Sequence, residues 1–465
     1  MVTIKFLGGV NEIGGNKILI EDKANDARVM LDFGMNFTRH GMFFEEFIQP
    51  RTSNGITDYL QMGVLPWMEG IYRPDLLEFA GRKAHSDQAI DAIVLSHAHL
   101  DHAAHISFID GAIPVYCSQV THAILKALHE TQPRSLGNEI LDYRKRPALD
   151  YKDRPIARKF NIVKGRFKVN GLEIELIPVD HSIPGACGML IYGSDRTVAY
   201  SGDLRLHGTD GHLTQEFVER LRIEKPDVFM CEGTRIDETE NRNEAYVKVN
   251  CDQAISQAKG LVIADFAFKD TTRFKTFLEI ARSTGRKLCI PFKDAYYIRA
   301  LAELVPGLPS LKDDSILLYQ KRRMSGTFRA SDYQSWEREF LDKGNTATAE
   351  AVGRMQEQAI AALGYFDVPE LIDIKPQPGS VYIKSASEAF NEEQQFDLER
   401  LKRWLAHFGI RYENYHASGH APGPDLAQVM NNSNAKVIMP IHTEKPELFQ
   451  GMAGNARVEL PILTK

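Results

Sequence analysis

The segment Asp91-Ala-Ile-Val-Leu-Ser-His-Ala-His-Leu-Asp-His102 joins a short apolar run to a dense group of metal-binding side chains. Its first six residues predict a buried strand, and the residues that follow predict a turn into a helix. Alternate side chains of an extended segment lie on one side, so His97 and His99 can share one metal ion, whereas Asp101 and His102 point toward a second position. Imidazole and carboxylate groups suit zinc, and crowding them is costly without an ion. We therefore expect a metal site rather than a polar surface loop.

Three further candidate ligands each follow another predicted strand, namely His181 after Leu172–Val179, Asp203 after Thr197–Ser201 and His442 after Lys436–Pro440. Taken singly, such an Asp is typical of a turn and such a His of packing. Together they complete a set for two ions, because functional groups collect at the carboxyl ends of strands. We expect His97, His99 and His181 to hold one ion, Asp101, His102 and His442 to hold the other, and Asp203 to bridge them. A water shared by the two ions would be ionised near neutral pH.

The composition is that of an ordinary globular protein with two domains, since the chain has 465 residues, of which 43% are hydrophobic and 25% charged. A net charge of -6 argues against nucleic-acid binding by bulk positive charge but leaves room for a local basic cleft. Five scattered cysteines without a C-x-x-C pair argue against a disulfide framework and against a cysteine-zinc site, and they favour a reducing, cytoplasmic location. We see no signal peptide and no apolar run near the roughly 20 residues that cross a membrane, so no membrane partner is expected.

The first part of the chain is rich in short strands, whereas residues 243–305 alternate between predicted helices and strands. Such alternation is typical of βαβ units with a parallel sheet. A long polar helix is predicted at about 346–363, and the glycine cluster at 8–15 is followed by a strand, which argues against a dinucleotide loop. The pattern indicates a β-rich domain interrupted by an inserted α/β domain.

These motifs carry a family resemblance. H-x-H-x-D-H, a later His, G-D and a late His resemble the metallo-β-lactamase superfamily. HASGH at 416–420, with His442 following 22 residues later, is similar to the end of the β-CASP nucleases. GGVNEIGGN at the start, MLDFG, DHSIPG at 180–185 and SGDLR at 201–205 make ribonuclease J the most similar member.

The resemblance implies the α/β fold class, with a metallo-β-lactamase αββα sandwich and an inserted β-CASP α/β domain. The implied boundaries are 1–230 and 391–465 for the sandwich and 231–390 for the insertion, with the active site in the cleft between them. The implied activity is metal-dependent hydrolysis of single-stranded RNA in RNA processing or decay, as an endonuclease or a 5′-to-3′ exonuclease. Two zinc ions per chain are implied, with Mn²⁺ or Mg²⁺ as alternatives, and a homodimer stays open.

The resemblance also assigns roles to residues outside the metal set. Glu232, His420 and His442 match the acidic residue and the two histidines of the β-CASP motifs, and a histidine at the third position accompanies RNA substrates. We expect His420 to protonate the leaving 3′-oxygen, and Glu232 to hold it charged. With Asp101 these two residues form the predicted catalytic set. The backbone amides of Ser418 and Gly419 are predicted to bind phosphate.

Several segments depart from the family or lack a firm role. The loops Ala267–Arg273 and Pro291–Asp294 replace the family's 5′-phosphate loops, which puts a 5′-monophosphate pocket in doubt. Segments 36–85 and 306–365 match nothing in the family, and we expect the first to cover the cleft. Two basic stretches are either solvated faces or a path for RNA. The first comprises Arg144–Arg146, Arg154, Arg158 and Lys159, and the second Lys321–Arg323. His105 lies one helical turn beyond the metal motif, where it is expected to support the ligands.

Two other functions stay open beside a ribonuclease. One is a β-CASP hydrolase that acts on DNA or on another phosphoester or ester, which the altered loops favour. The other is a nucleic-acid-binding protein with a vestigial metal site, which the complete set of seven ligands disfavours.

Overall fold

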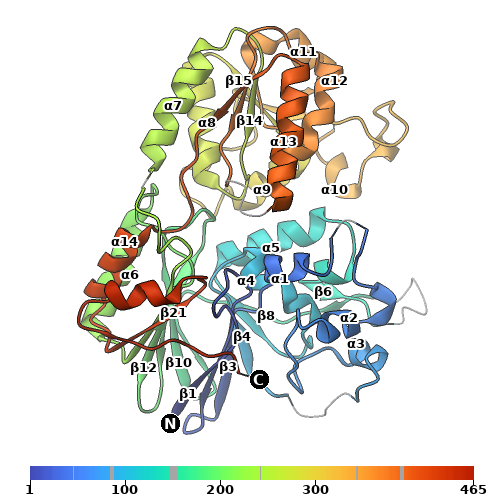
Figure 1. The fold of residues 1–465 in the computed structure, drawn as a ribbon. Coiled ribbons are helices and arrows are strands. Elements are labelled where there is room, and N and C mark those ends of the chain that lie inside the picture. Colours follow the sequence, from blue (N-terminus) through green and yellow to red (C-terminus); the bar gives the residue numbers. More distant parts are fainter. Residues whose placement is uncertain are drawn as a thin grey trace. The chain divides into compact units, whose positions relative to one another are not determined.

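A computed structural model describes residues 1–45, 47–83, 88–146, 154–240, 242–341, 344–387 and 392–464. The chain divides into two compact units (Figure 1). The first comprises Met1–Leu206, Asp210–Glu240 and Gly419–Lys465, and the second His207–Thr209 and Asn241–Ser418. The second unit is thus an insertion. The expected boundary at residue 231 would cut strand β13 (Val228–Glu232), which pairs on both sides within the first unit, and the expected boundary at 390/391 lies outside the described residues.

Two large mixed sheets form the main part of the first unit within the described residues, beside the small pair of β6 (Asp142–Tyr143) and β7 (Ile156–Ala157). One has the order β1 (Val2–Gly8), β2 (Lys17–Asp22), β3 (Ala27–Leu31), β4 (Ala92–Val94), β5 (Val115–Cys117) and β8 (Phe160–Ile162). The other has the order β22 (Arg457–Val458), β21 (Val437–Ile441), β13, β12 (Thr197–Tyr200), β11 (Cys187–Tyr192), β10 (Leu172–Pro178) and β9 (Gly165–Val169). The late strand β21 lies parallel to β13, so the end of the chain completes the sheet that the insertion interrupts.

The two sheets share one apolar core. Ile18 and Ile20 of β2 belong to it together with Leu172 and Ile174 of β10, and all four side chains have 0% exposure. These positions alternate along each strand, so one face of each sheet turns inward. The strands found by their apolar pattern in the sequence therefore form a sandwich.

Helices cover the outer faces of the sandwich (Figure 1). α6 (Gly211–Glu224) and α14 (Gly423–Asn432) pack on the second sheet through Phe217 and Leu426. α4 (Leu100–Ala103), the 3-10 helix η2 (Ala104–Phe108) and α5 (Gln119–Thr131) follow strands of the first sheet. The smaller elements are α1 (Phe37–Gly41), η1 (Thr52–Asn54), α2 (Thr57–Gln61), α3 (Pro74–Phe79), η3 (Leu136–Asn138), β6 (Asp142–Tyr143), β7 (Ile156–Ala157) and η7 (Pro446–Gly451). The predicted αββα sandwich is confirmed.

The second unit is built on one parallel sheet within its described residues. Its order is β17 (Thr346–Ala347), β16 (Ile316–Tyr319), β15 (Lys287–Pro291), β18 (Ala359–Ala361), β14 (Val262–Asp265), β19 (Val381–Lys384) and β20 (Arg411–Asn414). α7 (Glu244–Gln257) precedes the first of these strands in the chain. The helices between the strands are α8 (Thr271–Ser283), α9 (Phe292–Leu301), α10 (Ser335–Arg338), α11 (Ala349–Arg354), α12 (Leu371–Ile374) and α13 (Glu392–His407), with η4 (Ala330–Asp332), η5 (Gln356–Gln358) and η6 (Tyr365–Glu370). All strand pairs of this sheet are parallel, so the predicted βαβ texture is confirmed.

The long helix predicted at 346–363 is wrong. Its first part forms β17 and α11, but Ala359–Ala361 is a strand between β15 and β14 with both faces buried. A short apolar run that is buried on both faces looks the same in a strand and in a helix, so periodicity cannot separate them. In the part of the chain that the structure describes, no helix has the length and apolar character needed to cross a membrane.

Candidate metal centre

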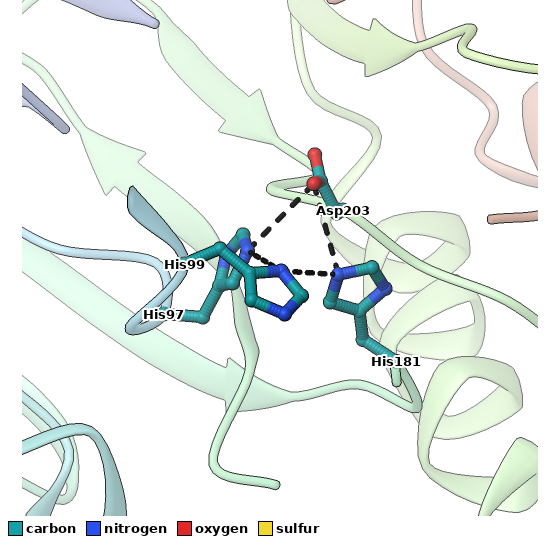
Figure 2. Close-up of side chains that lie close together, drawn as sticks. All are labelled: His97, His99, His181 and Asp203. Carbon is teal, nitrogen blue, oxygen red and sulfur yellow. Dashed lines mark hydrogen bonds and ion pairs between the residues drawn. The ribbon is translucent and has the colours of Figure 1, made fainter. Parts of the chain in front are cut away.

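Three histidines and one aspartate converge beyond the ends of three strands in the first unit (Figure 2). His97 and His99 follow β4, His181 follows β10 and Asp203 follows β12. His97 Nε2 and His181 Nε2 lie 3.1 and 3.0 Å from His99 Nδ1. Asp203 Oδ2 lies 3.7 Å from His97 Nε2 and 3.8 Å from His181 Nε2. The four atoms surround one point, so the structure brings the first predicted ligand set together.

A second set of donor atoms surrounds a neighbouring point. His102 Nε2 lies 3.1 Å from Asp203 Oδ2, and His442 Nε2 lies 3.2 Å from Asp101 Oδ2. His442 adopts a φ of 51°, which is uncommon for a residue with a side chain, and its backbone N–H donates to Gly9 O at 2.8 Å. This turn directs the imidazole of His442 back toward α4, 341 residues earlier in the chain.

Asp203 belongs to both sets. Its Oδ2 atom contacts donors of each set, and its Oδ1 atom is buried without a hydrogen-bond partner among the described residues. A buried carboxylate oxygen that lacks a partner costs free energy unless a cation neutralises it. Burial by itself raises the pKa of Asp203. The charges of His102 and His442 outweigh this effect and hold the pKa well below its ordinary value. The donor set therefore fits two divalent cations that share one carboxylate.

Burial also prepares two of the imidazoles as ligands. His97 is fully buried, and burial holds its pKa well below the ordinary value, with the charge of His102 acting in the same direction. The pKa of His181 is lowered in the same way by burial and by His99. A neutral imidazole offers a lone pair to a metal ion. Together with His99 and the Asp203 carboxylate, they form a donor set that zinc prefers.

In four of the ligand histidines the ring nitrogen that faces away from the centre has a protein partner, which orients the ring. The pairs are His97 Nδ1 with Ser96 Oγ at 2.9 Å, His102 Nδ1 with Asp32 Oδ2 at 2.7 Å, His181 Nδ1 with Gly419 O at 2.5 Å and His442 Nδ1 with Thr234 Oγ1 at 2.8 Å. Each of these rings therefore presents Nε2 to the centre.

Asp32 is a supporting residue to which sequence reasoning assigned no role. Its carboxylate accepts hydrogen bonds from Ser96 N and Ser96 Oγ at 2.7 and 2.8 Å, and from Tyr200 Oη at 2.6 Å. Tyr200 in turn accepts from Asn16 Nδ2 at 2.9 Å. Asp32 stands in the MLDFG motif, directly after strand β3, and adopts a positive φ of 55°. The motif is visible in the sequence, but this backbone conformation is not.

His420 and Glu232 form a pair at the edge of the second ligand set. His420 Nδ1 lies 3.1 Å from Glu232 Oε1, and His420 Nε2 lies 4.0 Å from Asp203 Oδ2. Glu232 is fully buried and also accepts from the backbone N–H groups of Leu204 and Thr234 at 3.1 and 3.0 Å. Burial lowers the pKa of His420, but the charges of Glu232 and Asp203 outweigh it and raise the pKa to about 9. These charges favour the protonated form of the His420 imidazole.

Comparisons with known proteins agree with this geometry. Residues 71–266 match the family model of the beta-lactamase superfamily domain. Curated relatives named Ribonuclease J include that of Mycoplasma genitalium, which is 23% identical over 95% of this chain and 68% of the relative, and that of Pyrococcus abyssi, which is 23% identical over 96% of this chain and 90% of the relative. The chain resembles ribonuclease J.

The fold of this ribonuclease J-like chain also has a solved counterpart. A protein of unknown function from Enterococcus faecalis V583 superposes with a TM-score of 0.74 and 22% identity, covering 100% of this chain and 99% of the other. At this identity the likeness shows the fold alone. The metallo-β-lactamase and β-CASP resemblance, and the fold that it implies, are thus confirmed.

The two predicted phosphate-binding residues of the ribonuclease J-like chain use their carbonyl groups in the structure. Gly419 O accepts the hydrogen bond from His181, and a Cβ atom on Gly419 would lie 2.6 Å from Ser182 Oγ. Ser418, in the second unit, accepts from His207 Nε2 at 2.9 Å. Gly419 thus helps to orient a candidate ligand, and amide contacts to phosphate stay a prediction.

The first basic stretch is in part structural. Arg158 is buried, donates to the carbonyls of Ser107 and Ile109, and lies 4.8 Å from the centroid of the Tyr143 ring, whose other neighbour is Arg73 at 3.9 Å. These contacts hold Arg158 inside the fold, so it is not part of a surface path for RNA. Arg154 and Lys159 are exposed.

In the second basic stretch each side chain has a carboxylate partner. Lys321 pairs with Asp367, Arg322 with Glu350 and Arg323 with Glu337 at 3.1 Å. Paired cations attract phosphate less than free ones do. The arrangement favours the solvated-face interpretation of this stretch.

His105 does not contact the metal ligands through its ring. Both of its ring nitrogens are buried without hydrogen-bond partners, and the ring packs against Phe108 and Tyr59 with centroid distances of 5.4 and 6.2 Å. Burial holds the pKa of His105 well below its ordinary value. The expectation that it supports the ligands is therefore wrong, and the ring acts as an apolar packing group.

Proposed function

We propose that this chain is a ribonuclease that hydrolyses phosphodiester bonds of single-stranded RNA with two zinc ions. The observation that carries the proposal is the position of Asp203, whose Oδ2 atom is common to two sets of donors. Relatives named Ribonuclease J along nearly the whole chain support RNA as the substrate. His442, a histidine at the third β-CASP position, supports RNA over DNA.

His97, His99, His181 and Asp203 would hold one ion, and Asp101, His102, His442 and the same Asp203 the other. When bound, the ions would supply positive charge at the phosphate and a water of lowered pKa. The chain's own residues exclude solvent around this point, since His97, His102 and His442 have 0% exposure and Asp203 has 1%. They also fix the direction of four of the five imidazoles, those of His97, His102, His181 and His442, through the outer nitrogen.

His420 is the proposed general acid. Its side chain is 20% exposed, so a substrate oxygen can approach the ring, whereas Glu232 behind it is fully buried. Glu232 keeps the imidazole protonated and holds Nδ1, which leaves Nε2–H available for the leaving 3′-oxygen of the scissile bond. The acid thereby prevents the build-up of negative charge on that oxygen.

A reducing compartment, expected from the scattered cysteines of the sequence, is also part of the proposal. All five cysteines are free and buried. A cytoplasmic location is therefore part of the proposal.

One assay tests the proposal and its alternatives. The holoenzyme is incubated with 5′-labelled single-stranded RNA and the matching DNA, each with a 5′-phosphate or a 5′-hydroxyl, with and without chelator. The expected result is chelator-sensitive cleavage of RNA in preference to DNA, with a ladder for an endonuclease and mononucleotides for an exonuclease. Cleavage of DNA alone, or binding of RNA without any cleavage, would overturn the proposal. Metal analysis of the purified protein separates zinc from manganese and magnesium.

A further inference from the structure

Five large apolar side chains are exposed between Phe37 and Ile48, in the first part of the segment that joins β3 to β4. Their exposed fractions are 43% for Phe37, 70% for Met42, 37% for Phe43, 95% for Phe47 and 69% for Ile48. We call these five residues the aromatic platform. Exposed apolar groups that gather in one short segment mark an interaction site more often than scattered ones do.

The platform is fixed to the helix that follows the metal ligands. Phe44, the buried neighbour of Phe43, packs on Tyr59 with ring centroids 5.7 Å apart. Tyr59 packs on Phe108 of η2 at 4.9 Å. Since η2 follows α4 without a break, the aromatic contacts tie the platform segment to the element that carries Asp101 and His102.

The platform also adjoins the metal centre through the backbone. Met35 N donates to Leu100 O at 3.0 Å, directly before Asp101. The side-chain amide of Asn36, which precedes Phe37, donates to Ile13 O at 3.2 Å. Gly14, which follows Ile13, packs closely on Asp101, because a Cβ atom added to Gly14 would lie only 2.9 Å from Asp101 Cβ. Phe37 thus begins the platform within two residues of a contact with the ligand helix.

We propose that the aromatic platform binds unpaired bases of the RNA strand beside the scissile phosphate. The proposal rests on the proposed ribonuclease function, because a phosphodiester held at the metal centre brings the adjoining bases to the surface next to it. Three of the five side chains are phenylalanine rings, and such rings stack on the face of any base. The neighbouring cations are engaged, Arg39 by Glu12 at 2.6 Å and Arg51 by Asp58 at 2.5 Å, so the platform offers stacking rather than charge.

The test replaces Phe37 and Phe47, singly, with Ala, Leu and Trp. Stacking on a base predicts that Ala and Leu raise KM for single-stranded RNA by at least about fivefold per ring, and that Trp retains the wild-type value. The matched control is Phe366→Ala in the second unit, which removes a ring that is 88% exposed and should leave KM unchanged. An oligoribonucleotide with abasic nucleotides around the cleaved bond should bind wild type and the Ala variants equally.

Two results would overturn the platform as a base-binding surface. One is a Leu variant as effective as Phe together with equal wild-type affinity for normal and abasic RNA. The other is loss of a dimer in the Ala variants, measured by analytical ultracentrifugation, with KM for RNA unchanged, which would identify a second copy as the occupant. Binding by fluorescence anisotropy in the presence of chelator separates the two proposals. If the wild type binds RNA through these rings but does not cleave it, the proposed ribonuclease function is wrong and the proposed base-binding surface stands.

Discussion

Asp32 Oδ2 lies 2.7 Å from His102 Nδ1, and both side chains have 0% exposure. The carboxylate thereby fixes the ring whose Nε2 atom belongs to the second ligand set. Asp32→Asn removes the charge that supports this orientation, so we expect affinity for one of the two metal ions to fall about 10- to 100-fold. Competition with a chromophoric chelator measures the change.

Asp22→Asn is the control for that substitution, because Asp22 is equally buried and accepts hydrogen bonds from Ser194 and Asn25 in a different part of the sandwich. Its removal should lower stability and leave metal affinity intact. Equal metal affinity in Asp32→Asn and wild type would contradict the role of Asp32.

The shared position of Asp203 predicts how metal content responds to substitution. Asp101→Ala removes a donor from one set only and should release one of the two ions. Asp203→Ala removes a donor from both sets and should release both. Inductively coupled plasma mass spectrometry of the purified variants measures the content, with circular dichroism as the check on folding. Normal occupancy in both variants would reject the ligand assignment.

The pair of His420 and Glu232 predicts a loss of rate without a loss of metal. His420→Ala should lower kcat on RNA about 10²- to 10⁴-fold, since general acid catalysis contributes that much, while the metal content stays at the wild-type value. Single-turnover cleavage and metal analysis together test this. Full turnover in the variant would rule out His420 as the acid.

Glu232→Gln should shift the alkaline limit of activity. The charge of Glu232 raises the pKa of His420, so the protonated acid persists to higher pH in the wild type. Without that charge the imidazole loses its proton at lower pH, and kcat should begin to fall at a lower pH than in wild type. A pH–rate profile measures the shift, and an unchanged alkaline limb would contradict the assigned role of Glu232.

Asp294 in α9 predicts a pH-dependent stability of the second unit. Burial, with the charge of Asp367, raises the pKa of Asp294 from 3.8 to about 8. The folded state therefore binds this proton more tightly than the unfolded chain, and the stability that it contributes is full below pH 3.8 and is lost as the pH rises through about 8. Asp294→Asn should raise the free energy of unfolding by the order of 1 kcal/mol at pH 9 and by less at pH 5.

Urea unfolding at the two pH values measures the effect of Asp294→Asn. Asp252→Asn, on an exposed position of α7, is the matched control and should change neither value. An equal effect of Asp294→Asn at both pH values would show that its charge does not govern stability.

Arg158 predicts a structural effect where the sequence suggested RNA binding. Arg158→Ala leaves the carbonyls of Ser107 and Ile109 without their donor, so we expect a loss of the order of 2–4 kcal/mol in stability. The slope of RNA affinity against salt concentration should stay unchanged, because no phosphate contact is lost. Lys159→Ala, at the exposed neighbouring position, is the control that should leave stability unchanged. A reduced salt slope for Arg158→Ala would contradict the structural role of Arg158.

The strands and the candidate metal ligands were predictable because their signals are local. Asp91–Ser96 is a compact apolar run, and His97, His99, Asp101 and His102 follow it within six positions, so the strand and four of the seven candidate ligands are read from one segment. The late ligand His442 was found because it also follows a strand. The helix expected at 346–363 failed because Ala359–Ala361 is buried on both faces, and burial of that kind has no periodic pattern.

By itself, the sequence determined the class of the fold, the order of the elements and the residue types that meet a metal ion. Only the tertiary structure decided that Asp32 lies behind His102, and that Arg158 and His105 are packing groups rather than functional ones. The reason is physical: a hydrogen bond between residues 70 positions apart, or the packing of a buried cation against an aromatic ring, depends on which strands pair and how the segments beyond them fold, and no local pattern of the chain encodes that distance.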